Sequence, residues 1–183
     1  MADQKHVEQV LRLANEISDH EPDHGDDDPE DIDQPSDEEI ECADLSDPDL
    51  RGANLSELDL AGVDLTNTVL KGANLSSSQL SDAYLFNAKL SNADLSEANL
   101  ARVDLTGANL RGANLMGANL TGACLNRTKL HDADLAGFDL TSARLIRANL
   151  RGANLRGADL CGADLTGADL TDANTSDTIG IGE

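Results

Sequence analysis

Leucine recurs at every fifth position over most of the chain. The series begins at Leu45 and continues without exception to Leu170, which makes 26 repeats. The residue two places before each leucine is usually alanine, and the residue between them is usually Asp or Asn. A helix repeats at about 3.6 residues and a strand at 2, so neither element produces this spacing. A fixed five-residue unit predicts a solenoid in which every unit turns the chain by the same amount.

Within each repeat, the leucine and the small residue before it are expected to face inward, and the other three residues are expected to face water. Several repeats have a residue larger than alanine at the small position, and the largest of these residues is Phe138. We expect Phe138 to bulge its wall or to fill space beside small neighbours. The expected core includes one leucine from every fourth repeat, namely Leu55, Leu75, Leu95, Leu115, Leu135 and Leu155.

A second period of 20 residues runs through the outward positions. The residue after the leucine is Lys or Arg at four of the seven positions spaced by 20 from Arg51, and at only one of the other 19 repeats, Arg156. All seven positions spaced by 20 from Asn54 are Asn or Asp. Four repeats therefore form one coil, and 26 repeats form about 6.5 coils. At about 4.8 Å per coil, the rod would be about 30 Å long.

The repeats also carry a family resemblance. Units such as RGANL at 51–55, SNADL at 91–95 and TGADL at 166–170 resemble the A(D/N)LXX unit of pentapeptide-repeat proteins over about residues 40–174. The resemblance implies an all-β fold, a right-handed quadrilateral parallel β-helix with four repeats to a coil. It also implies that the central leucine and the preceding alanine fill a narrow interior.

The residues before the repeats differ in composition. Apolar residues at helical spacing predict a short amphipathic helix over 3–17, whose apolar stripe either caps the open end of the repeat domain or binds a partner or another copy. Residues 18–41 are rich in Asp, Glu and Pro, which predicts a disordered acidic linker. We therefore divide the chain into a helix at 1–17, a linker at 18–41, a β-helix at 42–174 and a tail at 175–183. Ile179 and Ile181 are expected to help the tail cover the far end of the β-helix.

The net charge is −22, of which residues 1–42 contribute −14. This charge argues against direct binding of nucleic acid or of anionic lipid. No stretch approaches the 18 apolar residues of a membrane span, and Met1 to Ile17 carries charges where a signal peptide would be apolar. We therefore expect a soluble, cytoplasmic protein. Adaptation to high salt is a second explanation of the acidity, although it would spread the charge rather than concentrate it near the N-terminus.

The sequence offers no catalytic or cofactor constellation. His20 and His24 lie among acidic residues, but a solvated charge run explains them better than a metal site does. The cysteines, Cys42, Cys124 and Cys161, are not spaced for pairing, so we expect free thiols. No nucleophile stands beside a base, so an enzyme is the least expected class. We expect no metal and no cofactor.

Two outward features remain as candidate partner-binding sites. Tyr84 and Phe86 flank the inward Leu85, and two neighbouring exposed aromatic side chains are unusual on so polar a surface. The second feature is a basic wall, which is either a solvated face that balances nearby acids or a surface over which the acidic linker at 26–41 folds until an acidic partner displaces it. The basic wall comprises Arg51, Lys71, Arg111, His131 and Arg151, with Lys89 and Lys129 beside them.

Two functions are consistent with these features. The first is a non-catalytic scaffold that presents patterned walls to a protein partner, as a monomer or as a homodimer joined through a solenoid end. The second follows from the resemblance, because pentapeptide-repeat proteins of the quinolone-resistance type mimic DNA and bind DNA gyrase. The small net charge of the repeat region, −6 over residues 43–174, and the basic wall argue against mimicry. Ice binding is rejected, because the best threonine column is interrupted three times.

Overall fold

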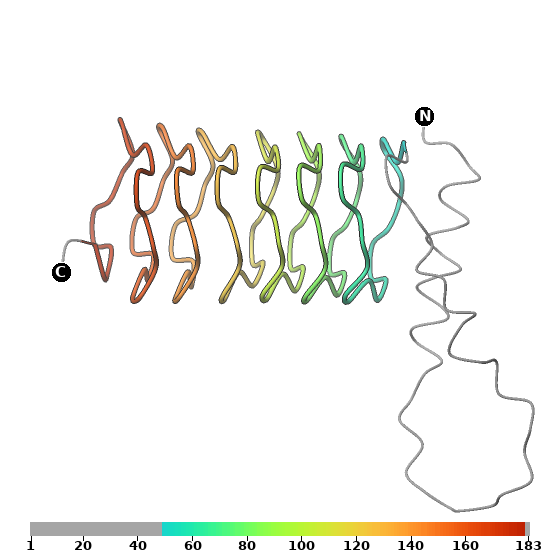
Figure 1. The fold of residues 1–183 in the computed structure, drawn as a ribbon, viewed down its shortest axis with the longest axis horizontal. Helices are drawn as coiled ribbons and strands as arrows, with labels where there is room; N and C mark the ends of the chain where they lie inside the picture. The colour runs from blue at the N-terminus through green and yellow to red at the C-terminus, as the bar shows by residue number, and fades with distance from the viewer. Residues whose placement is uncertain (1–48, 182–183) are drawn as a thin grey trace, which may run out of the picture.

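A computed structural model of the protein describes residues 49–181, and within that range the chain forms a stack of coils along one axis (Figure 1). Each coil is built from single-residue parallel bridges that join residue i to residue i+20, from Asp49↔Val69 to Asp159↔Ile179. Two-residue turns separate successive bridges, and the described range contains no α-helix. The helix expected at 3–17 and the linker expected at 18–41 lie outside the described residues.

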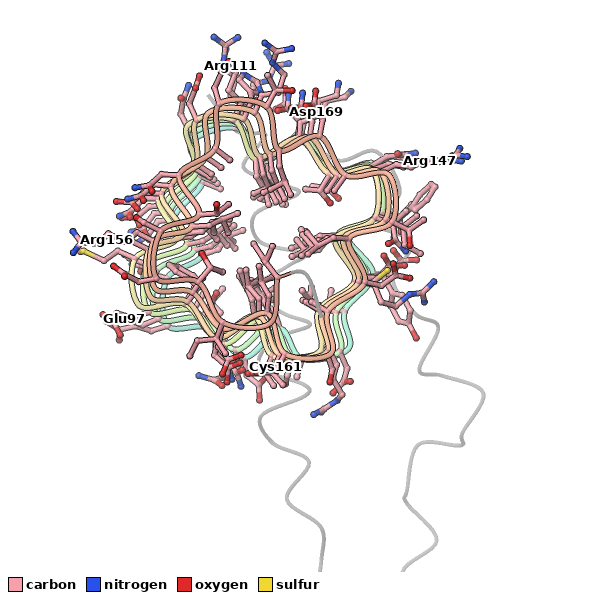
Figure 2. All side chains as sticks on the ribbon, turned by 90° about the vertical axis from the view of Figure 1, so that its left-hand side faces the viewer. Glu97, Arg111, Arg147, Arg156, Cys161 and Asp169 are labelled. Atoms are coloured by element: carbon pink, nitrogen blue, oxygen red, sulfur yellow. The ribbon has the colours of Figure 1, made fainter. Side chains whose placement is uncertain are left out.

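The coil has four walls, which meet in a square cross-section when the stack is viewed along its axis (Figure 2). We number the walls by their bridge residues: wall 1 contains 49, 69 and so on to 169, wall 2 contains 54 to 174, wall 3 contains 59 to 179, and wall 4 contains 64 to 164. Each wall includes the two turn residues that follow its leucine. In Figure 2, Arg111 and Asp169 mark wall 1, Glu97 and Arg156 wall 2, Cys161 wall 3, and Arg147 wall 4.

The core is a column of leucines on each wall with small residues between them. Every leucine of the repeat series from Leu50 to Leu160 is at most 3% exposed. The six expected core leucines, Leu55, Leu75, Leu95, Leu115, Leu135 and Leu155, are among them. Leu58 is not part of this series, because it occupies a small-residue position, and it is partly buried. Burial of a leucine side chain contributes about 1.5–3 kcal/mol relative to exposure. The same interior space recurs in each coil, so the same pair of residue types fills it each time.

Main-chain hydrogen bonds between coils satisfy the peptide groups. On wall 2, the Leu95 N–H donates to the Asn114 carbonyl at 2.7 Å, and the Asn114 N–H donates to the Ala93 carbonyl at 2.9 Å. Within the turn, the Ala98 N–H donates to the Leu95 carbonyl at 3.1 Å. This pattern repeats around the coil, so the ladder needs no continuous strand to satisfy buried backbone groups.

The turns explain the polar residues of the repeat. The second turn residue has a positive φ at all 26 positions from 52 to 177, of which 25 follow a leucine and the last follows Thr175, and 14 of these residues are not glycine. Glycine adopts this conformation without a steric cost, as at Gly137 with φ of 71°, whereas Arg147 adopts it with φ of 57°. The Asp or Asn before the leucine stabilises the turn, since the Thr106 N–H donates to Asp104 Oδ1 at 2.9 Å.

The ladder is interrupted beside Phe138. The bridges expected between Asn114 and Asp134 and between Asn119 and Asp139 do not form, although bridges form on both sides of these pairs. Phe138 is half-buried at the position that alanine occupies in the coils before and after it. Because an aromatic ring does not fit the space of a methyl group, the wall is displaced from the preceding coil, which is the bulge expected from the sequence.

The ladder also continues beyond residue 174, where the sequence analysis ended the β-helix. The Ile179 N–H donates to the Ala158 carbonyl at 2.9 Å, so the chain follows the coil path although Thr175 replaces the leucine. The side chains of Ile179 and Ile181 remain 56% and 39% exposed. The backbone register therefore persists for one more repeat than the leucine series does.

The interruption of the ladder should be visible in the hydrogen-exchange rates of individual backbone amides. The amides of Leu115 and Leu120 donate no backbone hydrogen bond within the described residues, whereas those of Leu95 and Leu100 do. We expect Leu115 and Leu120 to exchange about tenfold faster or more, measured by NMR on the native protein. Phe138→Ala should bring their rates close to those of Leu95 and Leu100. Unchanged rates in that variant would show that the ring does not cause the break.

Candidate interaction surfaces

The interior of the described coils is almost entirely apolar. The buried polar side chains among the described residues are Thr68, Ser78 and Thr128. The Ser78 hydroxyl donates to the Leu75 carbonyl at 2.7 Å, and the Thr128 hydroxyl donates to the Leu105 carbonyl at 2.9 Å. No group of three or more His, Cys, Asp or Glu within residues 49–181 could hold a metal ion. Candidate sites must therefore lie on the outside of the rod.

The structure brings the predicted basic residues together on wall 1. Their backbone positions lie in two neighbouring columns, one through the first turn residue and one through the bridge residue. Two members have acidic partners: Arg51 Nη2 lies 2.9 Å from Asp49 Oδ2, and Arg151 Nη2 lies 3.8 Å from Asp172 Oδ2. The members without an ion pair among the described residues are Lys71, Lys89, Arg111, Lys129 and His131.

His131 differs from its basic neighbours. Its side chain is half-buried, and its Nδ1 atom is buried without a hydrogen-bond partner among the described residues. It lines a shallow depression together with Asp132, Arg151 and Asp172. His131 is therefore part of the surface of wall 1 but is less exposed than the lysines and arginines around it.

Two arginines that the sequence analysis missed extend the basic surface around a corner. Arg127 and Arg147 occupy the second turn position of wall 4, which leads directly into wall 1, and both are exposed without an ion pair in the described range. Their spacing of 20 residues was visible in the sequence, but in a different column from Arg51. We define the basic band by seven residues, namely Lys71, Lys89, Arg111, Arg127, Lys129, Arg147 and Arg151.

Walls 2 and 3 carry the opposite charge. They contain nine acidic residues and two basic ones within the described range. Both arginines are neutralised: Arg102 forms a bidentate pair with Asp82, with the shorter contact at 2.6 Å, and Arg156 Nε lies 3.4 Å from Asp177 Oδ2. We define the acidic face by its nine acids, namely Glu57, Asp59, Asp82, Asp94, Glu97, Asp134, Asp139, Asp159 and Asp177.

The expected aromatic pair is exposed on wall 4. Tyr84 is 54% and Phe86 is 42% exposed. Tyr84 bridges to Asp64 and Asp104, so acidic residues lie directly above and below it. A third large apolar side chain, Met116 on wall 2, is 69% exposed beside the interrupted ladder and was not singled out from the sequence. The sequence did indicate its exposure, because the preceding positions of the same outward column, 56, 76 and 96, are all serine.

Cys124 and Cys161 lie on walls 4 and 3 and are not joined by a disulfide. Cys124 Sγ lies 3.1 Å from the Thr106 hydroxyl. Within residues 49–181, no helix is long and apolar enough to cross a membrane.

Comparison with known proteins identifies the repeat. The family model of pentapeptide repeats matches with 8 copies, over residues 41–77, 78–115, 98–137 and 139–174. The chain belongs to the pentapeptide-repeat family. Its fold is therefore the right-handed quadrilateral β-helix that the resemblance implied, and the described residues account for its four walls. No curated protein sequence matches the chain.

Several solved structures of pentapeptide-repeat proteins are similar. HetL, which is involved in heterocyst differentiation regulation in the cyanobacterium Nostoc sp. strain PCC 7120, is 31% identical over 74% of this chain and 82% of HetL, with a TM-score of 0.47. QnrB1, a plasmid-mediated fluoroquinolone resistance protein, is 29% identical over 63% of this chain and 64% of QnrB1, with a TM-score of 0.41. A thylakoid-lumen protein from Arabidopsis thaliana is 31% identical over 68% of this chain and 66% of its own, with a TM-score of 0.31.

The Asp residues that cap the turns of this pentapeptide-repeat protein have lowered pKa values. Hydrogen bonds from the Ser96 hydroxyl and N–H are the main cause at Asp94, and the Asn114 amide also lowers its pKa. The Thr141 hydroxyl and N–H lower the pKa of Asp139 in the same way. A side chain with a pKa lowered in the folded state stabilises the fold above its unfolded pKa, and this stabilisation is lost as the pH falls through the folded value.

A titration can test this cause. We expect the pKa of Asp94 to lie below its ordinary value of 3.8 and to rise in Ser96→Ala, because the hydroxyl donor is lost. Ser76→Ala, the matched change one coil earlier, should leave the pKa of Asp94 unchanged. The melting temperature should fall as the pH is lowered from 4 to 2.5. An Asp94 pKa that is equal in the wild type and in Ser96→Ala, measured by carboxyl NMR, would contradict the assignment.

Proposed function

We propose that this pentapeptide-repeat protein is a non-catalytic interaction scaffold that binds a protein partner in the cytoplasm. The observation that carries the proposal is the exposure of Tyr84 and Phe86 on a rigid wall whose other outward residues are mostly polar. Aromatic side chains contribute strongly at protein interfaces, because they bury a large area with few rotatable bonds. The closely packed interior supports a role for the surface rather than for an enclosed site.

The size of a wall indicates how a partner would bind. A standard interface buries about 800 Å² on each partner. A rod about 30 Å long would need a contact roughly 27 Å wide, which exceeds the width of one wall with its few extended residues. A partner centred on Phe86 would therefore also cover the corner between walls 4 and 1, where Lys89 and Arg127 lie.

Site-specific photo-crosslinking tests the scaffold. A benzophenone side chain placed at position 86 should yield one discrete crosslinked species in cells of the source organism. The matched control is position 166, which occupies the same column of wall 4 and is threonine. The same product from both positions, or none from position 86, would count against the aromatic patch as the partner site.

A second candidate function is binding to DNA gyrase as a mimic of DNA, and the segregation of charge favours it. The basic wall was counted against mimicry, but the basic band lies on wall 1 and at its corner with wall 4, apart from the acidic face on walls 2 and 3. Nine acids less the two paired arginines leave seven net charges over about 30 Å, or one per roughly 4 Å of axis, which is somewhat sparser than the 3.4 Å spacing along one DNA strand and less than half the density of a duplex. The 29% identity to QnrB1, a fluoroquinolone resistance protein, adds support.

A supercoiling titration with gyrase tests this candidate. If the acidic face acts as the mimic, the full chain should inhibit, and the triple variant Glu57→Gln, Glu97→Gln, Asp159→Asn should inhibit about tenfold less. A second variant with Glu30→Gln, Glu38→Gln and Glu39→Gln removes three charges from the N-terminal acidic run and should inhibit as the wild type does. Absence of inhibition at high micromolar protein would eliminate the gyrase candidate. Equal loss in both variants would show that net charge, not the acidic face, is responsible.

A further inference from the structure

We propose that the basic band is an intramolecular docking surface for the acidic run at residues 21–41 of the same chain. The first support is the absence of neutralising partners on the band. Six of its seven cations have no ion pair within the described residues, and the seventh, Arg151, lies 3.8 Å from Asp172. Between Thr66 and Gly152, the outward positions of wall 1 and of the turn that leads into it contain one acid, Asp132.

The second support is a stacked pair of like charges. Arg127 and Arg147 occupy the same turn position in successive coils, and the Arg127 N–H donates to the Ile146 carbonyl at 2.9 Å. Other stacked like charges in the described range are compensated: Arg51 above Lys71 pairs with Asp49, and Asp139 and Asp159 each accept a backbone N–H. Arg127 and Arg147 have no such compensation, so an anion placed between them would relieve their repulsion.

The occupant is indicated by charge. Residues 21–41 contain twelve Asp and Glu, and residues 13–50 contain no Lys or Arg. The acidic face of a second copy is also anionic, but its nine acids are spread over two walls. Seven of them already accept hydrogen bonds from an arginine or from a backbone N–H two residues along the chain. A tethered segment also acts at a high effective concentration, which favours it over a second molecule.

The acidic run can reach the whole band. The described chain begins at Asp49 on wall 1, the wall that carries most of the band. Five coil steps separate the level of Arg51 from that of Arg151, a distance of about 24 Å. Twenty-one residues can span up to about 70 Å when extended, so the run 21–41 can lie along the band and still connect to the first coil. The docked protein would present its acidic face to partners and would keep its basic band covered.

Carbodiimide crosslinking of the full chain tests the proposal directly. The reagent joins a carboxylate and an amine into an amide when they are in contact, and the lysines of the described range are Lys71, Lys89 and Lys129, all in the band. At low ionic strength, peptide mapping of the monomer should show crosslinks from Lys89 and Lys129 to acids within 21–41. At about 1 M salt, where the screening length is about 3 Å, the crosslinks should largely disappear.

Matched variants separate docking from general attraction. Arg111→Gln, Arg127→Gln, Arg147→Gln keeps all lysines and should lower the crosslink yield about tenfold. Arg102→Gln, Arg144→Gln, Arg156→Gln removes the same charge outside the band and should leave the yield unchanged. Absence of crosslinks at low salt, or equal yields in both variants, would overturn the proposal. Crosslinks that join isotopically heavy and light chains in a mixed sample would assign the band to a second copy instead.

Discussion

The narrow interior of the coil is the constraint on which the rest of the structure depends. Each wall offers space for one leucine and one small side chain, and main-chain hydrogen bonds to the coils above and below fix the spacing of the walls. A repeat therefore cannot gain or lose a residue without shifting every later leucine from the inside to the outside. The same constraint holds outward side chains in straight columns, and successive side chains within one column are about 4.8 Å apart. The surface is therefore a regular lattice of positions. Function then depends on which residue types occupy those columns.

This regularity made most of the fold predictable. The unbroken leucine series predicted the solenoid, and the 20-residue recurrence near Arg51 and Asn54 predicted four repeats to a coil, because residues in one column share one environment. Residues 20 apart in the sequence are also in direct contact. Asp82 and Arg102 occupy one column of wall 3 and form a bidentate ion pair. The exposure of Tyr84 and Phe86 also followed from the repeat, since inward and outward positions alternate around each leucine.

The features that the sequence did not predict depend on relations between columns. Arg127 and Arg147 were overlooked because they lie in a turn column of wall 4, whereas the predicted basic residues lie in the column of Arg51 and in the neighbouring bridge column of wall 1. Only the corner between the two walls joins these columns into one band. The extent of the break beside Phe138 was also unpredictable, because it depends on how far the wall moves before the ring is accommodated. Two bridges are lost, one of them on the neighbouring wall 2.

Charge in such columns is limited by repulsion. Two like charges one coil apart interact by about 1 kcal/mol in water, whereas two coils apart their separation exceeds the screening length of about 8 Å at physiological salt. The outward columns largely respect this limit: Lys71, Arg111 and Arg151 are separated by Ser91 and His131, and Glu57 and Glu97 are separated by Ser77. The stacked, uncompensated pair Arg127 and Arg147 departs from the pattern on a protein with a net charge of −22. A solvated face needs no such pair, because alternation would keep the same solubility with less repulsion. Stacked arginines are suited to an anionic segment whose carboxylates can lie between them, which is the property that distinguishes the basic band from a merely balanced surface.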